Sequence, residues 1–265
     1  SKTILTKKNR FTDSSGQHFI VGVVNDITDD IQIQTRQKAS RKVLELITSG
    51  EPLPAILEAI VNSVEQINPA MLCSILLLNE DRKCLQSGAA PSLPDFYNEA
   101  INGIAIGVGV GSCGTAASTN NRVVVDDIQN HPYWEPYKAL AAKANLKACW
   151  SQPIRSSNGD VLGTFAIYHR SKNRPTETDI TIIEHTANLA SIAIEKKRDE
   201  EKLKRAASVF THANEGIMIT NASAEIIEIN DTFCSITGYT REEALGRNPK
   251  ILQSNRHDKS FYAEM

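Results

Sequence analysis

The sequence predicts an α+β fold, in which an antiparallel sheet has helices to one side. Short runs rich in β-branched residues outnumber helical patterns in the middle of the chain, and longer helical patterns flank them at both ends. The turn sequence Ser156-Ser157-Asn158-Gly159 separates two of these runs, as in a β-hairpin. Strands joined in this way, with helices segregated from them, are typical of α+β domains.

The first thirty residues are predicted to form a β-hairpin. Residues 2–11 alternate loosely, a turn cluster follows at residues 13–16, and residues 19–24 are rich in β-branched side chains. Because two strands alone are not stable in water, we expect the hairpin to belong to a larger sheet. Thr28 is expected to cap the next helix, over residues 31–49, whose acidic first turn suits the positive end of the helix dipole.

The middle of the chain is predicted to contain a complete domain. Apolar residues at helical spacing indicate a helix that begins near Pro52. Strands are predicted at residues 71–78, 84–89, 122–125, 147–154 and 161–169. Short helices are predicted at residues 95–101 and 133–145, and the glycines between residues 107 and 114 indicate a tight loop.

A long helix is predicted from Thr176 to beyond Arg205. Its first half is apolar, whereas residues 195–205 are almost all charged and are expected to lie in water. A seam at spacings of three and four residues joins Ile182, Leu189 and Leu203, with charged residues interrupting it. The seam is compatible with a weak parallel coiled coil that makes a homodimer, and a solvated helical linker is the alternative.

The C-terminal segment is predicted to hold only part of a domain. Residues 216–221 and 225–230 indicate a second hairpin, Asn230 opens a helix, and Thr240 begins a capping box before another helix. A segment of this size with two strands has a marginal core. Since the patterns break off at both ends, we expect a piece of a longer protein.

Charge and composition exclude several classes of function. The chain has 29 Lys and Arg against 31 Asp and Glu, so no positive field is present to hold nucleic acid. The longest apolar run, residues 75–78, is far too short to span a membrane. The five cysteines are scattered and the histidines lack ligand spacing, so neither structural zinc nor a disulfide framework is expected. These features predict a cytoplasmic protein.

Three local patterns have competing interpretations. The loop Gly109-Val110-Gly111-Ser112-Cys113-Gly114 fits the dinucleotide fingerprint, but too few residues separate it from the next strand for a crossover helix, so a structural loop or part of a small-ligand pocket is expected instead. Cys113 and Cys149 are either a redox pair or small buried side chains. His185 is either a haem ligand or a core histidine.

Four segments within residues 51–195 keep the order and spacing of a known family. They are Gly111-Ser112-Cys113-Gly114-Thr115-Ala116-Ala117, Val124-Val125-Asp126-Asp127-Ile128, Ala148-Cys149-Trp150-Ser151-Gln152-Pro153-Ile154 and Val161-Leu162-Gly163-Thr164-Phe165. This part of the chain resembles the bacterial GAF sensory domain.

Both ends resemble parts of PAS domains. Residues 209–265 resemble the first half of one, through Asn230-x-x-Phe233, Thr237-Gly238-Tyr239 and Glu242-Glu243-x-x-Gly246. Residues 1–30 resemble the last two strands of another, ending in Asp26-Ile27-Thr28. Residues 31–50 and 196–208 are then helical linkers. This order is similar to the sensory part of bacterial proteins whose output is a cyclic-di-GMP cyclase or phosphodiesterase, or a histidine kinase.

Several residues by which GAF and PAS domains bind their cofactors are absent from this sequence. No cysteine is followed by the histidine typical of bilin attachment, and the cyclic-nucleotide signature of GAF domains is absent. In the second PAS segment, Pro249 stands where flavin photoreceptors have their adduct-forming cysteine. The cofactor is therefore unknown, with haem and non-covalent flavin left open. Cys113 lies in a loop shared with GAF-type free methionine sulfoxide reductases, whose other cysteines have no counterpart here.

The resemblance implies a sensory and signal-relay function. A pocket for an unknown small molecule is expected near six residues of the GAF sheet, namely Ser74, Cys113, Asp127, Tyr133, Trp150 and Phe165. The relay is expected to involve Asp26, Thr28, Ile182, Leu189 and Leu203, through helices that dimerise and lead to the flanking PAS and output domains. The alternatives are a dimerisation scaffold without a ligand and a methionine sulfoxide reductase that uses Cys113.

Overall fold

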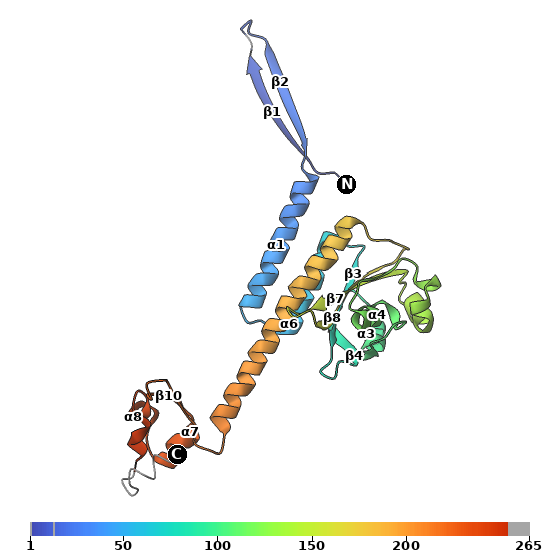
Figure 1. The fold of residues 1–265 in the computed structure, drawn as a ribbon. Coiled ribbons are helices and arrows are strands. Elements are labelled where there is room, and N and C mark those ends of the chain that lie inside the picture. Colours follow the sequence, from blue (N-terminus) through green and yellow to red (C-terminus); the bar gives the residue numbers. More distant parts are fainter. Residues whose placement is uncertain (1, 13, 254–265) are drawn as a thin grey trace. The chain divides into compact units, whose positions relative to one another are not determined.

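The computed structural model describes residues 2–12 and 14–253, which belong to two compact units (Figure 1). The first unit comprises residues 1–197 and the second comprises residues 198–265. The predicted PAS segment therefore lies partly outside the described residues, from residue 254 onward.

A six-stranded antiparallel sheet forms the centre of the first unit, in the order β5-β4-β3-β8-β7-β6. Its strands are β3 (Leu72–Leu78), β4 (Cys84–Ala89), β5 (Ile104–Ala105), β6 (Val123–Val125), β7 (Ala148–Arg155) and β8 (Val161–His169). The turn predicted at residues 156–159 joins β7 to β8, and these strands pair along their whole length. The α+β class predicted from the sequence is confirmed.

Helices cover both faces of the sheet, whereas the sequence predicted them on one side. One face carries α1 (Thr28–Thr48), α2 (Leu53–Ile67) and the first half of α6 (Glu177–His212). The other face carries α3 (Asp95–Ile101), α4 (Gly111–Thr119), η1 (Ile128–Asn130), η2 (Pro132–Tyr137) and α5 (Lys138–Lys143). Strand β8 is buried along its whole length, and β3 and β7 along most of theirs, so these strands lack the alternation that marks a face open to water.

Two helix boundaries differ from those predicted. Thr28 is the first residue of α1 and not its cap, because the Asp26 carboxylate accepts hydrogen bonds from the Thr28 amide (3.1 Å) and hydroxyl (2.6 Å). Residues 133–145 form η2 followed by α5 and not one helix. Pro136 within η2 lacks the amide proton that a continuous α-helix needs.

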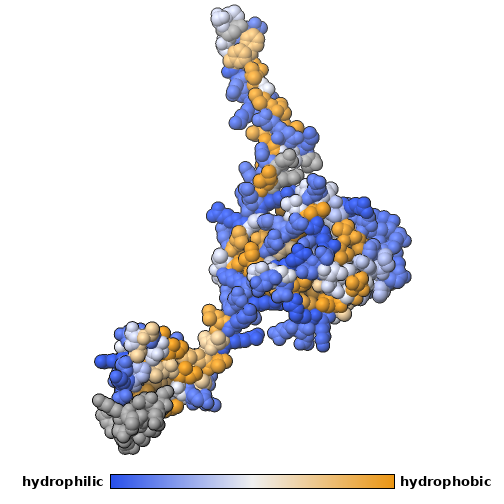
Figure 2. Space-filling model, in the orientation of Figure 1, coloured by the Kyte–Doolittle hydropathy of each residue, from blue (hydrophilic) through white to orange (hydrophobic). Residues whose placement is uncertain are grey.

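The N-terminal hairpin consists of β1 (Ile4–Thr12) and β2 (His18–Asp26) and exposes many large apolar side chains (Figure 2). Phe11 and Phe19 stack across the two strands, with ring centroids 5.1 Å apart. A continuous exposed apolar surface usually marks a place that other protein covers. It is what we expect of strands that belong to a larger sheet.

The second unit has a small core around a two-stranded sheet. Its elements are β9 (Met218–Thr220), β10 (Ile226–Ile229), α7 (Asp231–Thr237), α8 (Arg241–Ala244) and η3 (Pro249–Leu252). Asn230 caps α7, since its Oδ1 accepts hydrogen bonds from the amides of Phe233 (2.9 Å) and Ile217 (2.8 Å). The capping box predicted at Thr240 is present, with Glu243 as its second member.

Gly163 allows β3 and β8 to approach closely at the centre of the sheet. A Cβ atom at this position would lie 2.2 Å from the carbonyl oxygen of Leu76, which is closer than any non-bonded contact allows. Because backbone atoms make this contact, no side-chain rotation can relieve it. The sheet therefore requires glycine here.

We expect Gly163→Ala to lower the free energy of unfolding of the first unit by about 3 kcal/mol, because the added methyl group forces two central strands apart. The measurement is urea denaturation followed by tryptophan fluorescence, since both tryptophans of the chain, Trp134 and Trp150, are buried in this unit. Gly22→Ala is the control, because a Cβ there meets only a lysine side chain at 3.9 Å. Equal stability of the two variants would contradict the argument.

Candidate functional site

Three glycines let helix α4 lie closely on the sheet. Gly109 and Gly111 have φ values of +90° and +54°, which glycine adopts without strain. A Cβ atom on Gly114 would lie 2.8 Å from the Ala105 carbonyl oxygen. The glycine spacing therefore serves packing. After α4 the chain enters β6, which pairs antiparallel with β7, and not the parallel unit that a dinucleotide fingerprint requires.

A small cavity lies between the first turn of α4, η2 and the sheet. Its volume is about 20 Å³, roughly the space that one water molecule needs. Its lining is mostly apolar and aromatic, and its members include Tyr97, Ser112, Cys113, Trp134, Tyr137 and Tyr168. Side chains of the domain itself therefore occupy most of the space over this face of the sheet.

A chain of hydrogen bonds joins the two walls of the cavity. The Trp134 indole Nε1 donates to Ser112 Oγ (2.9 Å), and Ser112 Oγ donates to the carbonyl oxygen of Cys149 (3.3 Å). All three residues are buried. Ser112 thus fixes η2 to α4 and α4 to β7 with one hydroxyl group.

Two thiols meet next to this chain of hydrogen bonds. A hydrogen bond from the Cys149 thiol is the largest cause that lowers the pKa of Cys113, to about 7, against the effect of burial. Burial, and then the same hydrogen bond, raises the pKa of Cys149. The Tyr168 hydroxyl lies 3.8 Å from Cys113 Sγ and accepts a hydrogen bond from Ser74 Oγ (3.4 Å).

The structure brings only some of the six predicted pocket residues together. Ser74 and Cys113 lie in the buried layer beneath α4, and Tyr133 packs at its edge. Trp150 and Phe165 belong to the core on the opposite face, against the long helices. The reason is the period-two alternation of strands, which sends neighbouring residues to opposite faces.

Asp127 lies near the surface, away from the cavity. Its carboxylate pairs with the ammonium of Lys172 (2.6 Å) and accepts a hydrogen bond from Asn130 Nδ2 (2.6 Å). These contacts, that of Lys172 first, lower the pKa of Asp127. The contacts fix the loop after β6 to the segment that follows β8.

Of the residues that line the cavity, the sequence prediction included Cys113 and missed the others, among them Tyr97, Ser112, Trp134 and Tyr168. Tyr168 could have been found by alternation, since it shares a face of β8 with Ala166. Tyr97 and Trp134 come from α3 and η2, and no spacing in the sequence indicates that these elements meet.

The predicted relay residues are in different environments. Asp26 and Thr28 bond to each other where β2 leads into α1, and the Thr28 hydroxyl is the first cause that lowers the pKa of Asp26. Leu189 is buried in the core and Ile182 packs against it, whereas Leu203 is 73% exposed. The first part of the predicted seam therefore faces the domain's own core.

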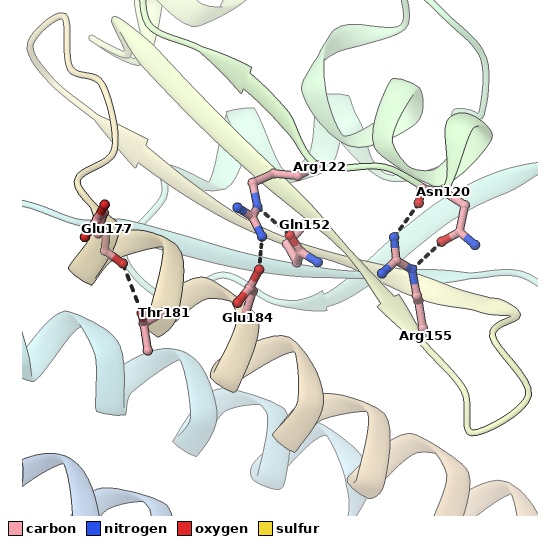
Figure 3. A network of polar contacts seen from close by, with 7 residues as sticks. All are labelled: Asn120, Arg122, Gln152, Arg155, Glu177, Thr181 and Glu184. Atoms are coloured by element: carbon pink, nitrogen blue, oxygen red, sulfur yellow. Dashed lines mark hydrogen bonds and ion pairs between the residues drawn. The ribbon is translucent and has the colours of Figure 1, made fainter.

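Polar contacts link α4 and β7 to α6, and Figure 3 shows two groups of them, one at Arg155 and one at Arg122. Arg155 on β7 donates from Nε to Oδ1 of Asn120, the C-terminal cap of α4 (2.8 Å). Ser191 on α6 donates to the Arg155 carbonyl oxygen (2.5 Å). Arg122, next to β6, forms an ion pair with Glu184 on α6. The helix that lines the cavity is thus linked through β7 to the long helix.

Two other features, a cluster of metal ligands and a membrane-spanning helix, are absent from the part of the chain that the structure describes. No three His, Cys, Asp or Glu side chains gather there as metal ligands would. Within residues 2–12 and 14–253, no helix combines the length and apolar character that crossing a membrane requires.

Family models match two parts of the chain. The GAF domain model matches residues 50–195, and the PAS fold model matches residues 204–265. The predicted succession of a GAF domain and a PAS segment is confirmed.

Two curated proteins and a solved structure are similar to this chain. The methyl sulfide methyltransferase-associated sensor of Methanosarcina acetivorans is 38% identical over 229 residues, which are 84% of this chain and 23% of that protein. The chain thus spans about a quarter of this relative's length. The nitrogen fixation regulatory protein of Klebsiella oxytoca is 40% identical over 58 residues, 22% of this chain and 12% of that protein. A solved structure from Burkholderia vietnamiensis, described as a GAF sensor protein, has a TM-score of 0.50 and a sequence identity of 19%. The match covers 63% of this chain and 98% of that chain, and it indicates a similar fold and nothing about function.

We expect Ser112→Ala to lower the free energy of unfolding by about 1–3 kcal/mol, because it leaves the buried Trp134 indole without an acceptor. In the double variant Ser112→Ala, Trp134→Phe, the loss should be smaller than the sum of the single losses, since no unpaired donor remains. Urea denaturation followed by far-ultraviolet circular dichroism measures all three variants. Additive losses would show that the hydrogen bond does not couple α4 to η2.

Proposed function

This chain belongs to the GAF domain family, and on that premise we propose that it is the sensory input segment of a longer signal-transduction protein. In this proposal residues 51–195 are the GAF domain and residues 209–265 the start of a PAS domain. Residues 1–30 are the end of another PAS domain, with helical linkers at 31–50 and 196–208. The exposed apolar hairpin and the matches of residues 50–195 and 204–265 support this order.

The proposed ligand site is the cavity beneath α4. The lining offers aromatic and aliphatic surface on most sides and polar groups at one end, where Ser112, Cys113 and Tyr168 meet. A site of this kind suits a small, mostly apolar molecule with one polar group. Because the cavity is about 20 Å³, a larger ligand must displace η2 by breaking the bond between Trp134 and Ser112. That displacement is the proposed signal.

The proposed relay runs from α4 to α6. The cavity and α6 lie on opposite faces of the sheet, and Asn120, Arg155 and Ser191 connect them by hydrogen bonds. Helix α6 begins in the core of the first unit and continues without interruption beyond residue 197. A change in α4 therefore reaches the helix that leads toward the PAS segment. A ligand shifts signalling only if it binds the two states of this relay unequally.

The complete protein is proposed to act in the cytoplasm as a homodimer. Its output is proposed to be a cyclic-di-GMP cyclase or phosphodiesterase, or a histidine kinase. The names of the relatives as a sensor and a regulatory protein support signalling of this general kind. Nucleic acid is not a partner in this proposal, since the net charge is −2.

One observation favours a second function, that of a scaffold without a ligand. The cavity is no larger than one water molecule, so the domain's own side chains already fill the site. In that case the GAF domain spaces and dimerises its neighbours. The reductase alternative requires turnover, and it is sustained only if the purified chain converts free methionine sulfoxide to methionine and loses this activity in Cys113→Ser.

For a ligand-binding site, we expect a native mass spectrum and an absorption spectrum of freshly purified chain to show a retained small molecule. Leu140→Trp should abolish retention, because Leu140 lines the cavity and the larger side chain fills it. Val108→Trp makes the same kind of change at a 65% exposed position and should leave retention unchanged. A bare protein mass for the wild type, with no spectral band, would favour the scaffold.

For the homodimer, we expect sedimentation velocity at tens of micromolar to give the mass of a dimer. Leu203→Asp should shift the chain to monomer, because it places a charge on an exposed apolar position of α6. Ser208→Asp adds the same charge on a different side of the helix and should leave the dimer intact. A monomeric wild-type chain at this concentration would rule out dimerisation through this segment.

A further inference from the structure

Cys113 and Cys149 are separated by 36 positions in the sequence but meet in the fold. Cys113 lies in the first turn of α4, Cys149 lies in β7, and α4 packs against β7. Cys113 Sγ lies 3.8 Å from the hydroxyl of Tyr168, and Tyr168 is the residue that pairs with Cys149 across β7 and β8. The Ser112 hydroxyl also bonds the Cys149 carbonyl oxygen, which fixes the two backbones beside each other. All five cysteines are free thiols, and Cys73 lies in the core on the opposite face of the sheet.

The surroundings of Cys113 suit a thiolate. The Tyr168 hydroxyl accepts a hydrogen bond from Ser74, so its own proton is available to Cys113 Sγ, 3.8 Å away. The buried hydroxyls of Ser151 and Thr164 have no hydrogen-bond partner among the described residues, and both lower the pKa of Cys113. The start of a nine-residue helix adds its partial positive charge.

The two thiols differ in acidity. The Cys149 thiol, followed by the hydroxyls of Ser151 and Tyr168, lowers the pKa of Cys113 to about 7, whereas burial raises the pKa of Cys149. The pKa values of the facing tyrosines, Tyr97 and Tyr168, are also raised by burial, so both stay protonated at neutral pH. One sulfur is thus a nucleophile and the other keeps its proton until an electrophile has formed.

The cavity limits which reagent can reach this pair. Cys113 is one of the residues that line the cavity. The cavity volume of about 20 Å³ admits a molecule of about the size of water. Hydrogen peroxide is close to that size, whereas glutathione disulfide and other bulky oxidants are far larger. Cys149 is completely buried behind Cys113. The order of reaction is therefore Cys113 first and Cys149 second.

We propose that Cys113 and Cys149 are a peroxide-sensitive dithiol that closes to an intramolecular disulfide. The Cys113 thiolate attacks one peroxide oxygen, the O–O bond breaks, and the leaving hydroxide takes a proton and departs as water, which leaves a sulfenic acid on Cys113. The Cys149 sulfur then attacks the Cys113 sulfur and expels a second hydroxide, which takes the Cys149 proton. In total, two thiols and one hydrogen peroxide give one disulfide and two waters, and two electrons pass from the sulfurs to the peroxide.

The consequence for signalling rests on the proposed function. Forming an S–S bond of about 2.05 Å pulls the first turn of α4 toward β7. Ser112 connects that turn to Trp134, so η2 moves as well. Oxidation and ligand binding would then act on the same part of the relay.

The test treats the whole reduced chain with a few equivalents of hydrogen peroxide and blocks the remaining thiols under denaturing conditions. Peptide mass spectrometry should show the loss of two hydrogens and a cross-link between Cys113 and Cys149. The rate should fall about tenfold from pH 8 to pH 6, as the thiolate fraction of Cys113 falls. Cys149→Ser should stop at a sulfenic acid that dimedone traps once the chain is unfolded, Cys113→Ser should form no disulfide, and Cys73→Ser should react like the wild type.

The wild-type cross-link map decides the proposal even where a variant fails to fold. No cross-link after complete exposure to peroxide, or preferential oxidation of Cys73, Cys84 or Cys234, would overturn it. The retention experiment with Leu140→Trp reports separately on the ligand. A retained molecule without a disulfide would contradict the dithiol proposal alone. A disulfide without a retained molecule would contradict the ligand-site proposal alone.

Discussion

Strands β3, β7 and β8 are covered on both faces of the sheet, so each of their side chains belongs to one of two separate cores. The strands alternate, so Ser74 faces α4 while its neighbours Cys73 and Ile75 face the long helices. One core thereby holds α1, α2 and α6 to the sheet, and the other encloses the cavity and the thiol pair. Gly163 allows β3 and β8 to approach closely at the centre of the sheet, so both cores depend on it.

The two cores are chemically different, and the difference suits a sensor. The core under the long helices is apolar, with Trp150 and Phe165 among mostly aliphatic residues, and it holds the first half of α6 against the sheet. The layer under α4 contains buried hydroxyl, thiol and phenol groups that bond to one another. A buried polar network is rigid while its groups are satisfied and costly when one is left unpaired, so a change at one of its members affects the others. In the proposed relay, the hydrogen bonds of Arg155 and Ser191 connect this layer across the sheet to α6.

Much of the fold could be predicted because its signals are local. The strand at residues 84–89 and the helix at residues 95–101 were predicted with the bounds that the structure shows. The capping box at Thr240 needs only two residues three positions apart. The cap assigned to Thr28 was wrong because the Thr28 hydroxyl donates to Asp26 and accepts from the Thr3 amide, and so caps no amide of the helix. The helix at residues 133–145 was wrong because Pro136 divides it.

The sequence by itself determined the class of the fold, the near-neutral charge and the family motifs, because composition, periodicity and turn chemistry are properties of neighbouring residues. Only the tertiary structure decided which of the predicted pocket residues share a site. Trp150 and Phe165 point away from Cys113, and Trp134 and Tyr168 take their place beside it. The face on which a buried strand residue lies depends on what packs above and below it, and only folding brings those elements together.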